Sequence, residues 1–372
     1  MPSPSKRRAA HTRPARAASL ARPTILDVAR HAGVSLGTAS NVLNGRGNVS
    51  ALRRASVAAA IADLGYVPNG LAQSLRRQRS RVVGLCMPVS SNAYFAALLE
   101  AFETIAAAQG YELMQVLSRH DPALELRRVR ALIARQVDGL IVVPGADSHA
   151  TFDAIATSGV PAVMVDRAAA DERFDYVTLD DCAAMAEVTK ALLRAGHRRL
   201  LFLVRHPNLV TTRDRISGFR AAAAGVRGAM AEVLVRDPDD AVFARTLRER
   251  LRAADRPTAL VASNSDLALA VLRNLRTLAL RCPDDVSVLT FDAPAWADVL
   301  EPPLSVVHPP TRELASRAWQ VLLERMAGRT GRPQRIVLAA RLELRASVAA
   351  PPRASARTSV RQPARASRGR SR

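Results

Sequence analysis

The chain has 372 residues, 48% of them hydrophobic, and a formal net charge of +21 at pH 7. This length suits a small domain beside a larger two-lobed one, and the charge points to a polyanion as partner. No stretch approaches the roughly 20 apolar residues of a membrane span, and no apolar segment follows the early charges, so the sequence argues against a membrane or exported protein.

The two ends of the chain carry much of the charge. Residues 1–22 and 350–372 hold 13 Lys or Arg and no acid, and subtracting these 13 from +21 leaves +8 for the remainder. Both stretches are rich in Ala, Ser and Pro without a periodic apolar face, which predicts disordered tails. Two interpretations stay open: solvated ends, or ends that contact DNA phosphates without sequence preference.

Two short helices joined by a tight turn are expected near the N-terminus. Thr24 and Asp27 form an N-cap signal, and the first helix stops at 31–33. Ser35 is a second N-cap, which starts a helix over 36–44. The apolar stripe of the first helix comprises Ile25, Val28 and Ala29. This spacing is typical of a helix-turn-helix, which occurs both in DNA-binding and in purely structural helical domains.

A third helix is expected from Ser50 to Leu64, with Gly65 as its C-terminal stop. The apolar residues expected on one of its faces are Leu52, Val57, Ile61 and Leu64. Farther along, Cys86, Cys182 and Cys282 are widely separated and lack metal-ligand spacing. They are most simply interpreted as reduced core residues of a cytoplasmic protein.

Beyond residue 80, apolar strand patterns alternate with helical ones. Helices are expected over 94–109 and 126–135. The expected strands are 82–87, 111–117, 139–144 and 161–165, followed by 199–204, 231–235, 259–262 and 286–291. This alternation predicts two α/β lobes, each with a buried parallel sheet covered by helices on both faces. A ligand cleft is expected between the carboxyl ends of their strands.

The residues themselves resemble the lactose and galactose repressor family of bacterial transcriptional regulators. In the first 85 residues the matching segments are Thr24-Ile-Leu-Asp-Val-Ala, Ala32-Gly-Val-Ser, Val42-Leu-Asn, Leu64-Gly-Tyr-Val-Pro-Asn69, Leu71-Ala-Gln-Ser-Leu75 and Ser80-Arg-Val-Val-Gly-Leu85. Farther on they are Val137-Asp-Gly-Leu-Ile, Val165-Asp-Arg167, Gly196-His-Arg-Arg, Arg215-Ile-Ser-Gly-Phe219, Arg256-Pro-Thr-Ala, Pro283-Asp-Asp-Val-Ser-Val, Phe291-Asp292 and Pro302-Pro-Leu-Ser. The resemblance covers residues 24 to about 349.

The resemblance implies a modular repressor. The implied parts are a basic tail (1–22), an all-helical helix-turn-helix head (23–67), a hinge helix and linker (68–79), a two-lobed domain similar to periplasmic binding proteins (80–349) and a second basic tail (350–372). Such a protein binds a pseudo-palindromic double-stranded operator as a homodimer in the bacterial cytoplasm and nucleoid. It needs no cofactor or metal. Both releasing and enabling effectors occur in the family.

Resemblance places the base-reading side chains at Leu36, Gly37 and Asn41. Leu36 can touch a thymine methyl, Gly37 has no side chain to offer, and Asn41 can pair bidentately with adenine. The positions expected to contact or brace the DNA backbone are Thr24, Thr38, Ser40, Asn44, Ser50, Arg53 and Asn69. Asn44, Ser50 and Arg53 are open to an alternative role as caps or solvated groups.

The segment 68–76 is too short and glycine-containing to be a stable isolated helix. In the family this hinge folds on DNA, pairs with its copy and inserts a leucine into the minor groove. That leucine corresponds to Leu75, with Ala72 and Gln73 beside it; the alternative is a flexible linker with an incidental leucine. Tetrameric relatives use a C-terminal leucine heptad, and residues 350–372 contain no Leu, so a dimer is expected.

The expected effector site contains Asn92, Tyr94, Phe95, Arg167, Arg215, Asn264 and Asp292. Amide, carboxylate and guanidinium groups around an aromatic ring suit a small polyhydroxylated ligand such as a sugar. Tyr94, Phe95 and Trp296 are the candidates for stacking on a sugar ring. An alternative for Arg215 and Asp292 is an ion pair that bridges the lobes. Two family pairs are altered here, to Asn264-Ser265-Asp266 and Asp180-Asp181.

The sequence disfavours two other classes of function. An enzyme is disfavoured because the chain lacks a nucleophile elbow, a phosphate-cradling loop and metal-binding cysteine pairs, and His197 is most simply a structural turn residue. A small-solute transport receptor would share the two-lobed domain. It would also need an export signal and would have no DNA-binding head.

Overall fold

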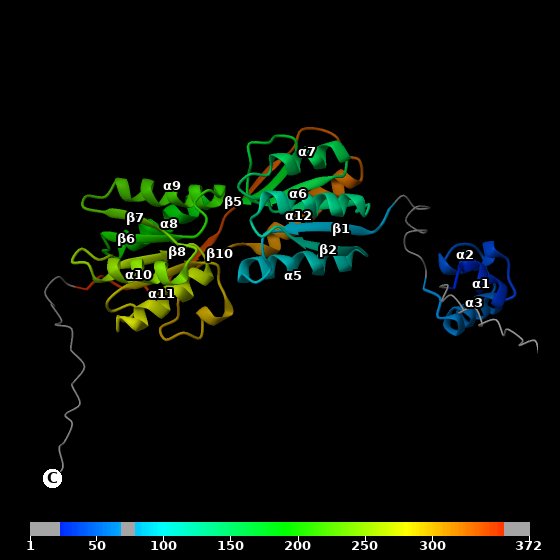
Figure 1. Cartoon of the computed structure of the whole chain (residues 1–372), viewed down its shortest axis with the longest axis horizontal. Helices are drawn as coiled ribbons and strands as arrows, with labels where there is room; N and C mark the ends of the chain where they lie inside the picture. Colours follow the sequence, from blue (N-terminus) through cyan, green and yellow to red (C-terminus); the bar gives the residue numbers. More distant parts are fainter. Residues whose placement is uncertain (1–22, 68–78, 353–372) are drawn as a thin grey trace, which may run out of the picture. The chain divides into compact units, whose positions relative to one another are not determined.

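The computed structural model describes residues 23–67 and 79–352, in two compact units that divide after Gln78. The N-terminal unit contains three helices: α1 (Ile25–His31), α2 (Leu36–Leu43) and α3 (Ala51–Leu64) (Figure 1). Thr24 caps α1 in a reciprocal capping box with Asp27, and Ser35 caps α2, as expected from the sequence. Gly65 ends α3 in the left-handed conformation.

A small apolar core joins these three helices. Val28 of α1 packs with Val57 and Ala60 of α3, and partly buried residues of the turn and of α2 surround them. Ile61 and Leu64 belong to this cluster as expected, but the prediction for Leu52 was wrong. Its side chain is 81% exposed, because it lies in the first turn of α3 on the side away from the core.

The first lobe of the C-terminal unit has a six-stranded sheet in the order β11-β5-β4-β3-β1-β2. Its strands are β1 (Val82–Met87), β2 (Glu112–Leu117), β3 (Gly139–Val142), β4 (Ala162–Asp166), β5 (Asp175–Leu179) and β11 (Arg335–Leu338). Its helices are α5 (Ala93–Ala108), α6 (Pro122–Ala134), α7 (His149–Ser158) and α12 (Thr311–Met326). Residues of α5 and α12 share one core with the sheet, and residues of α6 and α7 share the other, so both faces are covered.

The second lobe repeats this plan with a sheet in the order β12-β10-β9-β8-β6-β7. Its strands are β6 (Arg199–Val204), β7 (Met230–Val235), β8 (Ala259–Ala262), β9 (Ser287–Phe291), β10 (Ser305–His308) and β12 (Arg341–Glu343). Its helices are α8 (Asp181–Arg194), α9 (Val210–Ala224), α10 (Asp240–Arg252), α11 (Ser265–Thr277) and the short 3-10 helix η1 (Ala295–Ala297). Helices α8 and α9 cover one face, and α10 and α11 the other.

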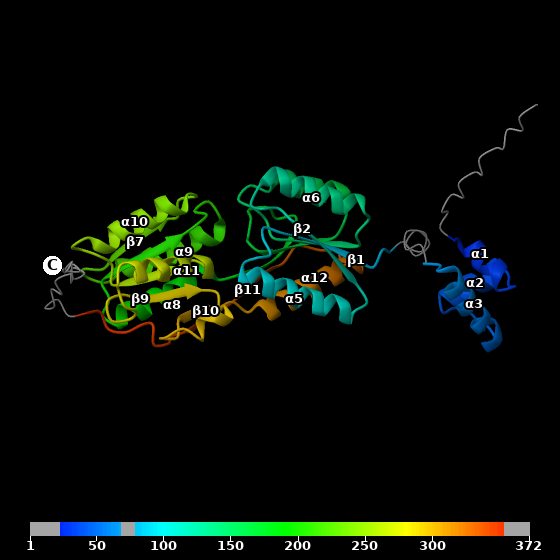
Figure 2. The same cartoon turned by 60° about the horizontal axis from the view of Figure 1, so that its bottom comes forward.

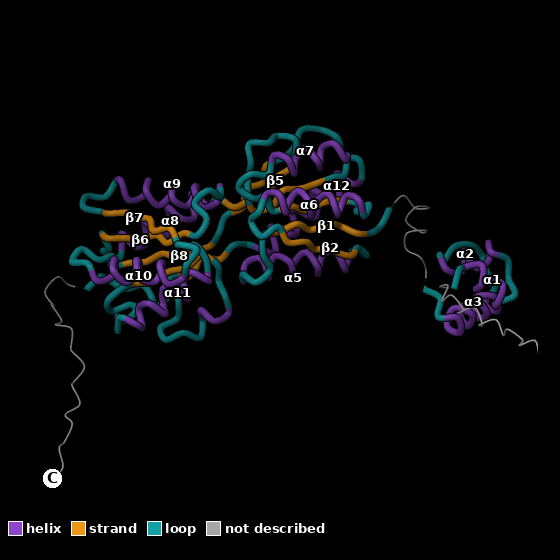
Figure 3. Tube along the Cα trace, viewed as in Figure 1, coloured by secondary structure: helices purple, strands orange, loops and turns teal. Residues whose placement is uncertain are grey.

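The chain crosses between the two lobes three times. The chain leaves the first sheet after β5, returns between β10 and α12, and leaves again between β11 and β12, as the colours in Figure 2 show. The sequence predicted parallel sheets, and this is confirmed except at one edge, where β12 pairs antiparallel with β10. The tube view in Figure 3 shows the same layering of strands between helices in each lobe.

Several predicted bounds need small corrections. The helix expected over 126–135 begins at Pro122, because Asp121 caps its first amides. Of the three cysteines, only Cys86 is buried; Cys182 is exposed at the start of α8, so the prediction of a core residue was wrong there. Among the helices of the described residues, none is both long and apolar enough to cross a bilayer.

The tightest packing between helices occurs where α9 crosses α8 at Gly218. A Cβ added to Gly218 would lie 2.1 Å from the carbonyl oxygen of Cys182. We expect Gly218→Ala to lower the free energy of unfolding by at least about 1–3 kcal/mol, the usual cost of overpacking. Urea denaturation measures this.

Gly225, at the end of α9, is the matched control. An added Cβ there meets nothing within 4 Å, and the φ of −77° suits alanine. Gly225→Ala should therefore leave stability within about 0.5 kcal/mol of the parent. Equal losses in the two variants would show that the α8–α9 approach is not the cause.

Candidate functional site

In the N-terminal unit, the exposed face of α2 presents the three predicted base-reading residues. Leu36 is 46% exposed although it is apolar, and Gly37 and Asn41 are exposed one and five positions farther along. Ala39, on the opposite face, is completely buried. The helix is therefore fixed by its buried side while its N-terminal half offers an open surface, as a helix entering a major groove must.

The residues predicted to contact the DNA backbone surround this face, and several already have local roles. Thr38 donates its amide to Ser35 at 3.2 Å, and Asn44 donates its side-chain amide to the carbonyl of Ser40 at 2.6 Å. Thr24 holds the α1 capping box. Ser50 precedes α3 without a side-chain cap, and Arg53 is exposed. The hinge residues Asn69, Ala72, Gln73 and Leu75 lie outside the described residues.

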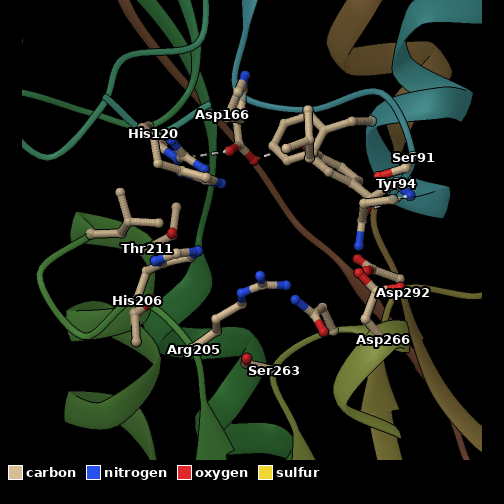
Figure 4. Close-up of a pocket in the computed structure, with 18 of the residues that line it drawn as sticks. Ser91, Tyr94, His120, Asp166, Arg205, His206, Thr211, Ser263, Asp266 and Asp292 are labelled. Atoms are coloured by element: carbon tan, nitrogen blue, oxygen red, sulfur yellow. Dashed lines mark hydrogen bonds and ion pairs between the residues drawn. The ribbon is translucent and has the colours of Figure 1, made fainter. Parts of the chain in front are cut away.

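A cleft of about 540 Å³ lies between the lobes of the C-terminal unit. Its walls come from the loops that follow β1, β2 and β4 in the first lobe and β6, β8 and β9 in the second, and Figure 4 shows side chains from both lobes converging on it. All seven residues predicted for the effector site line it: Asn92, Tyr94, Phe95, Arg167, Arg215, Asn264 and Asp292.

The first-lobe wall is organised around Asp166, which sequence reasoning did not select. The Tyr94 hydroxyl donates to Asp166 at 2.7 Å, and the Asp166 carboxylate lies 3.4 Å from Arg167 Nε. Arg167 also donates to the carbonyl of Pro144 at 2.8 Å and lies over the Phe95 ring. Burial and the nearby Asp166 charge raise the pKa of Tyr94 well above its ordinary value, so Tyr94 stays a hydroxyl donor.

On the second-lobe wall, Arg215 pairs with Asp181 rather than with Asp292. Its Nε donates to Asp181 at 2.6 Å, its Nη1 donates to the carbonyl of Ser263 at 2.9 Å, and its guanidinium lies 4.0 Å from the centre of the Phe291 ring. Arg215 and Asp292 both belong to the second lobe. The alternative of a bridge between lobes was therefore wrong.

Asp292 lies at a contact between the lobes. It is 7% exposed, and it accepts a hydrogen bond from the Ser265 amide of its own lobe at 3.5 Å. The Asn92 side chain of the first lobe lies near enough to lower the pKa of Asp292 and partly offset the effect of burial. The carbonyl oxygen of the Asn92 side chain caps α5 by accepting from Tyr94, which leaves its amide for Asp292. Asn264 caps α11 in the same way, accepting from Leu267 at 2.9 Å.

Several lining residues lay beyond sequence reasoning. They include Arg119 and His120 after β2, Arg205 and His206 after β6, and Thr211 and Thr212 at the start of α9. A partial signal existed for Asp166, which stands beside Arg167 in the Val-Asp-Arg segment. Trp296 was wrongly predicted as a stacking residue: it packs against the core of α10 and α11 and does not line the cleft.

Within the described residues, no group of three or more His, Cys, Asp or Glu is arranged to hold a metal ion. His197 is buried and does not line the cleft. Its ring nitrogens lie 2.9 Å from the Thr258 hydroxyl and 2.8 Å from the carbonyl of Ala349. Burial lowers the pKa of His197, so a neutral ring ties the end of the described chain to the second lobe.

Comparison with known proteins places these two units in one family. A family profile described as "Bacterial regulatory proteins, lacI family" matches residues 24–69, and one described as "Periplasmic binding protein-like domain" matches residues 189–348. The HTH-type transcriptional repressor PurR of Vibrio parahaemolyticus is 30% identical over 82% of this chain and 92% of its own length. The chain belongs to the LacI family of bacterial regulatory proteins.

Solved structures of other LacI-family proteins share this architecture. The Lac repressor dimer bound to operator and an anti-inducer is 25% identical, with a TM-score of 0.78 over 89% of this chain and all of that one. A CelR–cellobiose complex is 29% identical, with a TM-score of 0.65 over 88% of this chain and all of that one. These relatives are transcriptional regulators with the same mixed α/β fold.

The buried carboxylate of Asp292 predicts a pH dependence of stability in this LacI-family protein. Burial raises its pKa to about 6 from 3.8, partly offset by Arg215. Because the folded state then holds the proton more strongly, this stabilising contribution is complete below about pH 4 and is lost as the pH rises through 6. The stability of Asp292→Asn relative to the parent should increase over that range, by up to about 3 kcal/mol.

Urea denaturation of the full chain at pH 4, 5, 6 and 7 measures this difference. Asp147→Asn, at an exposed carboxylate, is the control and should show no such trend. A constant difference between Asp292→Asn and the parent at all four pH values would contradict the raised pKa.

Proposed function

We propose that this protein is a cytoplasmic repressor that binds a pseudo-palindromic DNA operator as a homodimer and responds to a small polyhydroxylated effector. The observation that carries the proposal is one chain that combines an exposed recognition helix with a two-lobed cleft. Neither unit alone would support a repressor that responds to an effector. A transport receptor would have no use for α2, and a constitutive DNA-binding protein would not need the cleft.

The proposed DNA contact is made by α2 in the major groove. Asn41 pairs with an adenine edge, Leu36 packs on a thymine methyl, and Gly37 lets the backbone approach closely. The hydroxyls of Thr24, Thr38, Ser40 and Ser50, the amides of Asn44 and Asn69 and the guanidinium of Arg53 hold phosphates. The hinge residues Ala72, Gln73 and Leu75 then act in the minor groove, where Leu75 is a wedge that only paired hinges can support.

The proposed effector lies in the cleft, with its hydroxyl groups on Asn92, Asp166, Arg167, Arg215 and Asp292. A volume of about 540 Å³ falls in the range of small-molecule sites. The CelR–cellobiose complex supports a sugar-like ligand by relationship. Because Asn92 and Asp292 lie on opposite lobes, a ligand that engages both changes the balance between open and closed lobes and so the spacing of two hinges.

A catalytic role is not proposed. Tyr94 donates to Asp166, Arg215 donates to Asp181, and Asp292 accepts from the Ser265 amide. None of these contacts pairs a nucleophile with a base in the arrangement that acyl or phosphoryl transfer needs. A solute receptor is the second candidate. The capped helix-turn-helix of the N-terminal unit argues against it.

Substitutions on α2 and α3 should separate base reading from phosphate contact. Asn41→Ala should reduce discrimination between the operator and a one-base variant by about 1–3 kcal/mol at one position per half-site. Arg53→Ala should instead weaken binding to all duplexes and lower the log-log salt slope by roughly 0.9 per phosphate lost. Fluorescence anisotropy on operator and random DNA at several salt concentrations measures both.

In this experiment the parent operator comes from selection of a random duplex library with the purified protein. If Asn41→Ala changed the salt slope and left discrimination intact, α2 would not be the base-reading helix. Arg53→Ala should not alter the preferred sequence.

The active unit should contain two subunits. Light scattering of the full-length protein without DNA should give a mass near twice 40.0 kDa. A tetramer would contradict the expectation, which rests on the absence of a leucine heptad in residues 350–372.

A further inference from the structure

We propose that the rim of the cleft contains an anion subsite formed by Arg205, His206 and His120, so that the effector carries a phosphate or carboxylate as well as hydroxyl groups. This inference rests on the proposed function and narrows its ligand class. It comes from the distribution of charge between the floor and the rim of the cleft.

The charges on the floor of the cleft compensate one another. Arg167 lies against Asp166, Arg215 is bonded to Asp181, and Asp292 accepts from the Ser265 amide and lies beside Asn92. The four side chains of these two ion pairs are each at most 15% exposed. A ligand charge buried here would lose hydration without gaining a free counter-charge, so the floor suits neutral hydroxyls.

The rim, by contrast, has uncompensated positive charge. Arg205 and Arg119 are exposed, and among the described residues no carboxylate lies within ion-pair distance of either guanidinium. The neighbouring Arg236 is already paired with Asp240. Asp266 is the one acid of the rim, and Figure 4 shows it on the side opposite His120 and His206.

His120 and His206 form a contact between the lobes beside Arg205. Their ring centres lie 4.3 Å apart with planes tilted by 30°, and Nδ1 of His120 is buried without a hydrogen-bond partner. Burial together with Arg167 and Arg205 lowers the pKa of His120 to about 3, and burial together with Arg205 and Arg167 lowers that of His206 to about 4. Both rings are thus neutral, because the nearby positive charges disfavour their protonation. A bound anion would offset these charges.

The start of α9 adds donors on the same side. This 15-residue helix begins after Leu209 without a side-chain cap, and Thr211 and Thr212 of its first turn line the cleft. The first amides of a helix favour negative charge. The Nε of Arg167, 3.4 Å from Asp166 in the ion pair of the floor, is also buried without a hydrogen bond. Backbone strain marks the same region, because Arg119 and His120 both have positive φ, at 53° and 61°.

The test uses inorganic phosphate and acetate as probes, which require no knowledge of the sugar. The full-length protein, labelled with ¹³C at histidine, is titrated with each anion against chloride of equal ionic strength. We expect the signals of His120 and His206 to shift selectively among the seven histidines and their pKa values to rise by at least one unit with the preferred anion. A larger response to phosphate indicates a phosphorylated effector, and a larger response to acetate indicates a carboxylate.

Arg205→Gln should weaken anion binding at least tenfold. Arg220→Gln, an exposed arginine on α9 outside the cleft, is the matched control and should leave it unchanged. Equal behaviour of the two variants, or no selective histidine shift with either anion, would overturn the proposal. Failure of the repressor proposal would instead appear in the DNA-binding experiment with Asn41→Ala, which does not depend on Arg205.

Discussion

The buried pair between Arg215 and Asp181 is the contact on which the cleft depends. Asp181 begins α8 directly after the chain leaves the first lobe at β5, and Arg215 lies on α9, which packs on α8. The pair therefore connects a lobe crossing to the binding surface. Loss of either partner would leave an uncompensated buried charge, which typically costs about 3–5 kcal/mol.

Two of the contacts between the lobes are made by polar side chains. Asn92 reaches Asp292 across the cleft, and His120 stacks on His206. Such contacts are strong when the water is excluded and are readily exchanged for contacts to water or ligand. A cleft closed in this way can open at modest cost, which is what an effector-controlled switch needs.

The helix-turn-helix unit, unlike the cleft, is specified mainly by contacts between residues close in sequence. Its structure follows from local signals: the capping box at Thr24, the cap at Ser35 and the left-handed Gly65. Its apolar core is small, so caps contribute a large share of its stability. Leu36 of α2 stays outside this core and is 46% exposed.

The sequence by itself was sufficient for features that depend on neighbours along the chain. It predicted the three N-terminal helices, the β1 strand and most strand bounds, because capping and hydrophobic periodicity act over a few residues. It also selected Asn92, Arg167 and Asp292 for the cleft through their position after strands, and Arg215 through family resemblance.

Only the tertiary structure decided which charges neutralise one another. Arg215 and Asp181 are 34 residues apart, and His120 and His206 come from different lobes, so no local pattern links them. The same holds for Trp296 of η1, which packs, partly buried, against the core of α10 and α11. The charged side chains of the cleft lie on loops and helices that the two sheets bring together. The order of these segments along the chain does not indicate which of them lie close in space.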